Sequence, residues 1–471
     1  MAIPGGGAHI LVFPYPAQGH MLPLLDFTHQ LVLRGLTITI LVTPKNLPVV
    51  NPLLSRHPSI ETLILPFPSH PSIPAGVENV KDLPSNSFRS MMTALRQLHD
   101  PLLHWFRSQP SPPSAIISDF FLGWTQHLAS QLSIPRVVFS PSGAAFVSLI
   151  NYLWLETPQR DDPNDPDFPI SFPKIPDSPI YPWRQLSYVY RSYIPGDPEG
   201  ALIRDDFLAN IASWGIAFNS FSVLERQHLR HLEKDFGEDR VWAVGPLLPP
   251  DDDPTAPSER GGSTSVSAGG VISWLDNRED NSVVYVCFGS QAVLTNEQME
   301  AMAVGLERSG VHFVWCVKEA TVGHMAGKFS VVPAGFEGRV VGRGLVIRGW
   351  APQVPILRHR AVGSFLTHCG WNSVLEGIVA GVPMLAWPMT ADQFVDAKLL
   401  EEVGVGVKVC EGALTVPDSS VLAKAMAESV SGNWSKRVRA MQLQKAALES
   451  IMEDGSSSMD LDRLVEELSE L

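Results

Sequence analysis

A chain of 471 residues is long enough for two or three domains with sizeable cores. Hydrophobic residues make up 45% of it and charged residues 18%, a composition that excludes a disordered chain. The formal net charge of −14 argues against nucleic acid or an anionic membrane as a partner, because no run of lysine and arginine offsets it.

The cysteines and the first residues bear on the compartment. The four cysteines lack a Cys-x-x-Cys spacing, which indicates buried thiols of a reducing compartment and not a disulfide framework or a zinc site: Cys287, Cys316, Cys369 and Cys410. The opening MAIPGGGAHILVF has no basic region and too short an apolar run for a signal peptide. The longest other apolar run, residues 144–155, is too short to span a bilayer. We therefore expect a cytoplasmic protein without membrane insertion. Separately, we expect a monomer.

The chain opens with a β-α-β pattern. A buried strand is predicted at residues 9–13, followed by a helix that ends at Gly35 and a second strand at residues 37–42. Strands joined in this way lie parallel. His20 falls at the N-terminus of the helix, where the helix dipole disfavours the imidazolium and leaves a ring that can accept a proton. The alternative for a single histidine is a helix-start residue without chemistry.

A further strand, residues 115–118, ends at Asp119. A carboxylate at this end of a strand can accept a hydrogen bond from one imidazole nitrogen and leave the other basic. The alternative is that Asp119 only caps the helix that follows.

The middle of the chain is irregular and then flexible. Residues 156–200 are rich in proline, aspartate and aromatic residues and are expected to form a long loop region, with Trp183 in it. The Pro-, Asp-, Ser- and Gly-rich stretch that follows is typical of a linker. The predicted divisions are a domain at 1–248, a linker at 249–270, a domain at 271–450 and a C-terminal helical segment at 451–471.

The second domain begins with a strand and a turn suited to phosphate. Residues 283–288 are a continuous apolar run, typical of a central parallel strand. Gly289 and Ser290 follow it and let backbone and hydroxyl approach a phosphate. Thr295 and Gln298 form a capping box for the next helix.

Residues 350–393 combine strand, turn, helix and strand. An apolar run at 361–366 leads through a polar turn at 367–371 into a helix that opens at Asn372 and stops at Gly381. The N-terminus of such a helix presents free N–H groups and a positive dipole end, which suits an anion and above all a diphosphate.

Side chains around this turn fit a nucleoside diphosphate. His368, Asn372 and Ser373 would surround the anion with donors. Glu376 lies one turn deeper on the same helix face, where its carboxylate can accept both hydroxyls of a ribose diol.

The two ends of the stretch complete the pattern. Trp350 offers a flat face on which a base can stack. Asp392 and Gln393 supply acceptors and donors for sugar hydroxyls.

Together, the WAPQ start, the THCGWNS centre and the DQ end of residues 350–393 resemble the signature box of plant secondary-product UDP-sugar glycosyltransferases, members of glycosyltransferase family 1. The likeness runs from HILVFPYPAQGH to the final helix and is nearest to the branch that acts on flavonols and hydroxybenzoates. It implies the GT-B architecture: two Rossmann-like parallel-sheet α/β domains that face across a cleft, with the C-terminal helix packed back on the first domain.

The resemblance also implies residue roles. His20 would be the general base and Asp119 its partner, Trp350 would stack on uracil and Glu376 would hold the ribose. The implied donor-site residues are Ser290, Trp350, Ala351, Gln353, His368, Gly370, Trp371, Asn372, Ser373, Glu376, Asp392 and Gln393. The implied acceptor-site residues, of which core packing explains the phenylalanines nearly as well, are Phe120, Phe121, Ser142, Phe146 and Trp183.

These roles imply a metal-independent, inverting transfer of glucose from UDP-glucose to a flavonoid, phenol or hydroxybenzoate, with no bound cofactor. Gln393 favours glucose, and UDP-rhamnose or UDP-xylose is the alternative donor. A metal-dependent transferase would use an Asp-x-Asp motif, for which residues 251–253 and 460–462 are candidates, but their places in a linker and a terminal helix are most simply explained by solvated charge. A nicotinamide enzyme is disfavoured because no GxGxxG follows the first strand. A non-catalytic nucleotide-sugar-binding protein remains the alternative of a different class.

Overall fold

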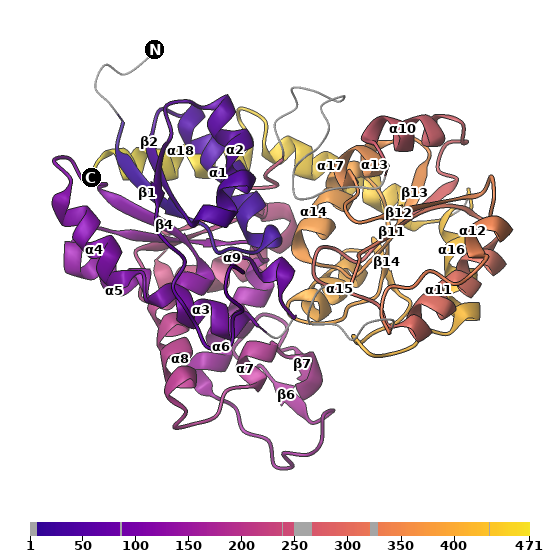
Figure 1. The fold of residues 1–471 in the computed structure, drawn as a ribbon, viewed down its shortest axis with the longest axis horizontal. Helices are drawn as coiled ribbons and strands as arrows, with labels where there is room; N and C mark the ends of the chain where they lie inside the picture. Colours follow the sequence, from indigo (N-terminus) through magenta and orange to yellow (C-terminus); the bar gives the residue numbers. More distant parts are fainter. Residues whose placement is uncertain (1–6, 85–86, 238, 249–265, 321–327, 433) are drawn as a thin grey trace. The chain divides into compact units, whose positions relative to one another are not determined.

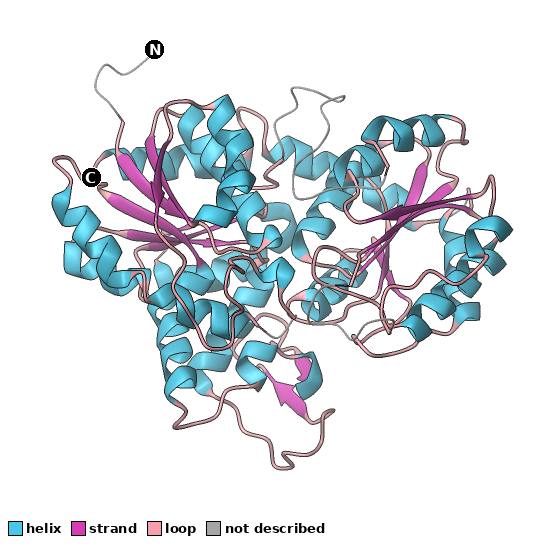
Figure 2. Ribbon diagram, in the orientation of Figure 1, coloured by secondary structure: helices cyan, strands magenta, loops and turns pink. Residues whose placement is uncertain are grey.

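The computed structural model describes residues 7–84, 87–237, 239–248, 266–320, 328–432 and 434–471. These residues form two compact units, one within Met1–Pro250 and Ser450–Leu471 and the other within Asp251–Glu449 (Figures 1 and 2). Residues 249–265 of the predicted linker lie outside the described residues. Its end at 268–270 is already helical, because Ser267 caps the first helix of the second unit by accepting from the N–H of Gly270.

The described part of the first unit contains a parallel sheet of seven strands in the order β3-β2-β1-β4-β5-β8-β9. Their bounds are β1 His9–Phe13, β2 Thr37–Val42, β3 Glu61–Ile64, β4 Ala115–Asp119, β5 Arg136–Ser140, β8 Gly215–Phe218 and β9 Val241–Ala243. The helices are α1 Gln18–Leu33, α2 Leu47–Arg56, α3 Phe88–Arg96, α4 His99–Ser108, α5 Thr125–Leu132, α6 Ala144–Glu156, α7 Tyr188–Arg191, α8 Pro198–Ile211, α9 Ser222–Phe236 and α18 Ser456–Ser469. The predicted β-α-β opening is confirmed, with β1 parallel to β2.

The C-terminal helix belongs to the core of this unit. Leu461, Leu464 and Leu468 are buried along one face of α18 and pack in the same cluster as β-strand residues such as Ile10 and Ile38. Helical spacing explains the contact, because positions three or four residues apart share one face.

Residues 156–200 are more ordered than the prediction of one long loop. They include a two-stranded antiparallel hairpin, β6 Pro169–Ser171 with β7 Ile180–Pro182, and the short helix α7. Three-residue strands carry too little of a period-two pattern to be recognised in a proline-rich stretch.

The described part of the second unit contains a parallel sheet of six strands in the order β12-β11-β10-β13-β14-β15. Their bounds are β10 Val283–Cys287, β11 His312–Val317, β12 Gly344–Arg348, β13 Val362–Thr367, β14 Met384–Ala386 and β15 Gly406–Lys408. The helices are α10 Ala268–Asp276, α11 Asn296–Ser309, α12 Phe336–Arg339, α13 Gln353–Arg358, α14 Trp371–Ala380, α15 Gln393–Glu402, α16 Ser419–Ser429 and α17 Lys436–Ser450.

The helix start and the helix end that the sequence predicts in this unit are confirmed. Thr295 and Gln298 form the predicted capping box. Gly381 ends α14 in the left-handed conformation, with φ at 70°. Each unit has one parallel sheet, and the loops that follow its strands gather at the carboxyl edge of that sheet.

Among the described residues, no helix combines the length and the apolar character that crossing a membrane requires. The four cysteines are free thiols. Three of them are buried as expected, whereas Cys410 is only half-buried because it lies after β15, the edge strand of its sheet.

Candidate functional site

A histidine and an aspartate meet at the carboxyl edge of the first sheet. His20 lies in the first turn of α1, and Asp119 is the last residue of β4. His20 Nδ1 lies 2.8 Å from Asp119 Oδ2, with the histidine side chain 15% exposed and the aspartate 0% exposed. Asp119 Oδ1 also accepts the backbone N–H of Phe121 at 2.9 Å, so one carboxylate serves both the histidine and the turn. A proton on Nδ1, shared with the carboxylate, leaves Nε2 able to accept one.

Aromatic rings surround the histidine. Phe121 and Phe120 stack on it with ring centroids 5.0 and 5.7 Å away. Phe88, at the start of α3, lies 6.2 Å from the same ring and 5.6 Å from that of Phe121. Tyr15 packs 5.2 Å from the histidine. The sequence did not predict a role for Phe88, because this residue is far from His20 and Phe121 in the chain and meets them only in the folded structure.

A buried arginine fixes the turn that carries Asp119. Arg136 is 0% exposed, and its guanidinium donates to Ser118 Oγ at 2.8 Å and to the backbone oxygen of Asp119 at 3.3 Å. A third donation ties it to Asn210 Oδ1 on α8 at 2.9 Å, and Asn210 in turn donates to the backbone oxygen of Phe120 at 2.6 Å. Burial lowers the pKa of Arg136 to about 9, which still leaves it charged at neutral pH.

The other predicted acceptor residues are less directly connected to the histidine. Ser142 and Phe146 are buried at the start of α6, and Trp183 lies half-buried beneath the guanidinium of Arg160. Within the described part of the chain, no ring contact joins Phe146 or Trp183 to His20. Of the five predicted acceptor residues, the structure thus brings Phe120 and Phe121 to the histidine.

In the second unit, a histidine is enclosed by glycines before α14. A Cβ atom on Gly289 would lie 2.6 Å from the ring of His368, and one on Gly370 would lie 2.5 Å from its Nε2. Burial lowers the pKa of His368 to about 4, so the ring is neutral at pH 7. Gly370 is the N-cap of α14 and makes no side-chain capping bond, and the N-terminal end of a helix is the end at which an anion is favoured.

One glutamine joins two predicted donor-site residues. Gln353, at the start of α13, donates from Nε2 to Ser373 Oγ at 3.0 Å and to Glu376 Oε2 at 2.7 Å. Ser373 and Glu376 lie on one face of α14, as the three-residue spacing predicts. The carboxylate of Glu376 is therefore held from the side of α13.

The aromatic donor-site residues differ in exposure. Trp350 is half-buried after β12. Ala351 is buried, as is Trp371, whose side chain is 2% exposed. Trp371 is the first residue of α14, and Asn372 follows it half-buried.

Gln393 and Asp392 start α15. Gln393 Oε1 accepts the backbone N–H groups of Met389 and Thr390, both at 3.0 Å, so the amide carbonyl faces the turn. The amide nitrogen must then point away from that turn. The orientation makes Gln393 a donor to whatever lies in front of it.

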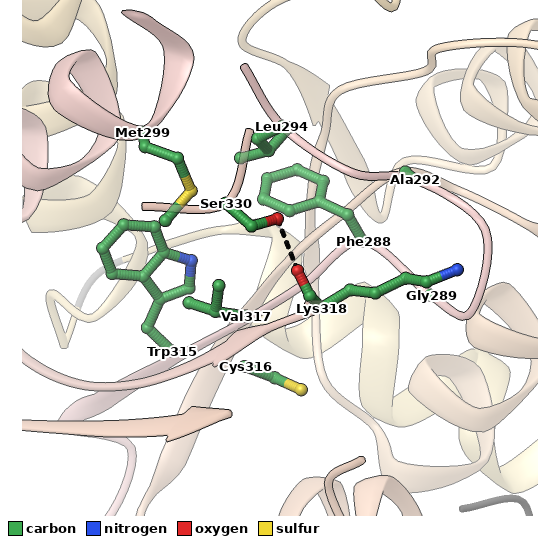
Figure 3. Close-up of a pocket in the computed structure, with 10 residues that line it drawn as sticks. All are labelled: Phe288, Gly289, Ala292, Leu294, Met299, Trp315, Cys316, Val317, Lys318 and Ser330. Carbon is green, nitrogen blue, oxygen red and sulfur yellow. Dashed lines mark hydrogen bonds between the residues drawn. The ribbon is translucent and has the colours of Figure 1, made fainter. Parts of the chain in front are cut away.

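A lysine missed by sequence reasoning supports the Gly289–Ser290 turn. Lys318 follows β11 directly, and its ammonium donates to the backbone oxygen of Ser290. Figure 3 shows the bond in which Ser330 Oγ donates to the backbone oxygen of Lys318 at 2.5 Å. The small pocket drawn there is lined by Phe288, Gly289, Ala292, Leu294, Met299, Trp315, Cys316, Val317, Lys318 and Ser330. Lys318 could have been found from the sequence, because it stands at the end of a predicted strand, as Asp119 does.

The Asp-x-Asp candidates have other partners or are not described. Residues 251–253 lie outside the described residues. Asp460 accepts the backbone N–H of Ala243 at 2.9 Å and a guanidinium N–H of Arg463 at 3.0 Å. Asp462 pairs with Arg34, the C-cap residue of α1, at 2.5 Å. Both carboxylates thus hold α18 to the first unit.

The chain is similar to known proteins. Residues 271–452 match the family model "UDP-glucoronosyl and UDP-glucosyl transferase". UDP-glycosyltransferase 89B2 of Stevia rebaudiana is 59% identical over 98% of both chains. Flavonol 3-O-glucosyltransferase UGT89B1 of Arabidopsis thaliana is 58% identical over 98% of this chain and 96% of that one. The chain therefore belongs to the UDP-glycosyltransferase family and is a sugar transferase of the plant type.

Solved structures agree with this assignment. The crystal structure of Arabidopsis thaliana UGT89C1 complexed with UDP-L-rhamnose has a TM-score of 0.81 at 42% identity, covering 99% of this chain and 100% of that one. The same protein complexed with quercetin gives a TM-score of 0.80 over 98% and 100% of the two chains. The fold is thus the GT-B fold of the plant UDP-glycosyltransferases.

Proposed function

We propose that the protein is an inverting O-glucosyltransferase that uses UDP-glucose and a small aromatic acceptor, such as a flavonoid, phenol or hydroxybenzoate. The observation that carries the proposal is the pair formed by His20 and Asp119 over 2.8 Å. A protein that only bound nucleotide sugars would have no use for an oriented base in its other unit. The aromatic rings stacked beside His20 favour a flat, apolar acceptor.

In the proposed reaction, His20 Nε2 removes the proton from the acceptor hydroxyl as the oxygen attacks the anomeric carbon of the donor. The bond between that carbon and the diphosphate oxygen breaks, and UDP leaves with the electron pair from the opposite face. Attack from the face opposite the leaving group inverts the anomeric centre. Asp119 keeps the imidazole in the required tautomer and stabilises the imidazolium that forms.

When the bond to the anomeric carbon breaks, the diphosphate oxygen keeps the electron pair and gains one negative charge, which donors of the second unit can stabilise. The N–H groups at the start of α14 and the side chains of His368, Ser373 and Ser290 are the donors we assign to it. The Lys318 ammonium beside the Ser290 carbonyl adds a positive charge at the same edge of the sheet.

Glucose is the proposed sugar because Gln393 presents its amide N–H₂ away from the turn that it caps. The second candidate is UDP-rhamnose, since a relative of 42% identity has been crystallised with UDP-L-rhamnose. UDP-xylose is the third. The acceptor class draws support from the flavonol 3-O-glucosyltransferase of 58% identity and from the quercetin complex.

The test is to incubate the protein with UDP-glucose and a panel of flavonols, phenols and hydroxybenzoates, beside a His20→Ala control, and to identify products by mass. A hexose adduct that is lost in the control supports the proposal. Product with UDP-rhamnose or UDP-xylose alone would keep the mechanism and overturn the choice of sugar. UDP binding without product on any acceptor would favour the non-catalytic alternative.

Two further properties belong to the proposal. Full activity in EDTA is expected, whereas its loss would revive the metal-dependent alternative. We also propose a cytoplasmic monomer: the four free thiols suit a reducing compartment, and light scattering of the purified protein measures the oligomeric state.

A further inference from the structure

Tyr285 occupies a fixed position under the predicted ribose site. It is the third residue of β10 and is 0% exposed. Its ring stacks on that of Phe365, the residue paired with it on β13, with centroids 5.1 Å apart and planes 23° from parallel. A central strand on one side and a stacked ring on the other leave the phenol little freedom to move.

The hydroxyl of Tyr285 reaches the loop after β12. It donates to Gln353 Oε1 at 3.2 Å. Burial raises the pKa of Tyr285 well above its usual value, so the group stays protonated and remains a donor at any pH at which the protein works. The bond therefore links the middle of the sheet to the start of α13.

Gln353 connects Tyr285 to Glu376 through hydrogen bonds. With its carbonyl oxygen bonded to Tyr285, the amide nitrogen uses its two N–H groups on Ser373 Oγ at 3.0 Å and Glu376 Oε2 at 2.7 Å. Three contacts on one planar amide define both its position and its orientation. Without the phenol, the carbonyl oxygen would lose its partner in a partly buried setting and the amide would be free to shift.

We propose that Tyr285 is a positioning residue for nucleotide binding, which holds the Gln353 amide so that the Glu376 carboxylate is ready to accept the ribose hydroxyls. The inference rests on the proposed donor site, in which Glu376 receives the ribose diol. It concerns only the nucleotide half of the reaction and does not depend on His20 or on the acceptor.

The experiment compares two nucleotides by isothermal titration calorimetry with the full chain. UDP carries both ribose hydroxyls, and 2′,3′-dideoxy-UDP carries neither. For Tyr285→Phe, which removes only the hydroxyl, we expect UDP to bind about five- to tenfold more weakly, the loss typical of one hydrogen bond. The affinity for 2′,3′-dideoxy-UDP should stay within about twofold, because the contact being positioned is absent from that ligand.

A matched control and a second variant separate positioning from general damage. Tyr152→Phe removes a phenol hydroxyl from the first unit, where the ring packs on Phe172, and should leave both affinities unchanged. In a Gln353→Leu background, the effect of Tyr285→Phe on UDP should disappear, since the connecting amide is gone.

The outcomes are distinct. Equal weakening of both nucleotides would mean that Tyr285 only supports the fold, and no weakening of either would mean that it has no role; each result overturns the inference and leaves the donor site standing. A wild-type protein that does not distinguish UDP from 2′,3′-dideoxy-UDP would overturn the ribose role of Glu376 itself.

Discussion

The Nδ1 atom of His20 and the Oδ2 atom of Asp119 are 2.8 Å apart, and the remaining oxygen of Asp119 accepts the N–H of Phe121. Asp119→Asn tests this arrangement. An asparagine that donates its N–H₂ to Nδ1 would leave the proton of the neutral ring on Nε2, where the base is needed. We expect kcat/KM on a phenol to fall about 10²- to 10⁴-fold, while UDP affinity stays unchanged. A variant within threefold of the wild type would show that the aspartate only caps the turn.

The acidity of the acceptor should decide how much His20 matters. A phenol has a pKa near ~10 and needs help to lose its proton at neutral pH, whereas a carboxylate is already ionised. His20→Ala should therefore reduce glucosylation of a phenol far more than ester formation on a benzoate. Rates on both acceptor types at pH 7 measure the difference. Equal losses would assign His20 to acceptor binding and not to proton transfer.

Much of the fold follows from local patterns in the sequence. The run HILVF forms β1 and VVYVC forms β10 because fully apolar runs of strand length suit the buried centre of a parallel sheet. Gly381 and the Thr295 capping box end and begin helices as predicted. The hairpin of β6 and β7 was missed because its strands have three residues each, too few to show a period.

Some residues of the candidate site could likewise be predicted from the sequence, and others could not. His20, Asp119 and the turn before α14 could be located because each stands next to a recognisable strand or helix end. Tyr285 could not, because within an apolar run its side chain is indistinguishable from other core residues. Its hydroxyl can donate to Gln353 only because the fold brings β10 and α13 close together. Tertiary partners of this kind leave no periodic signal.

The low pKa of His368 makes a prediction about acid stability. Its folded value of about 4 lies below the ordinary value of 6.5, so between these values the unfolded chain binds the proton and the folded chain does not. Stability is therefore present above pH 6.5 and declines as the pH falls toward 4. From pH 7.5 to 5, the loss from this group is about 2 kcal/mol at most, because solvent screening of a partly exposed ring reduces it.

Thermal unfolding of wild type and His368→Asn at the two pH values measures this contribution. The melting temperature of the wild type should drop by up to about 4–8 °C more than that of the variant. Parallel decreases in the two proteins would mean that the histidine titrates normally in the folded state.

Gln393 should act on the sugar and not on the nucleotide. Gln393→Glu keeps an oxygen for the N–H groups of Met389 and Thr390 but replaces the outward N–H₂ donor with a second oxygen. We expect kcat/KM for UDP-glucose to fall about 10- to 100-fold, as for a lost hydrogen bond in a specific site. The affinity for UDP, which has no sugar, should change much less. A comparable loss for both ligands would place Gln393 at the diphosphate.

The tight enclosure of His368 offers a test of the diphosphate site that leaves the backbone intact. Gly370 has φ at −61° and ψ at 141°, which alanine adopts readily, so Gly370→Ala introduces no backbone strain. The new Cβ would lie 2.5 Å from His368 Nε2, and the ring must move away from the start of α14. UDP should bind more than about tenfold more weakly, since the displaced ring no longer donates to the diphosphate. Gly338→Ala is the matched control, because a Cβ there meets nothing within 4 Å on α12, and it should leave the affinity for UDP unchanged. Calorimetric titration of both variants at pH 7.5 decides the matter: if Gly370→Ala binds UDP as tightly as Gly338→Ala does, the diphosphate does not depend on the position of His368.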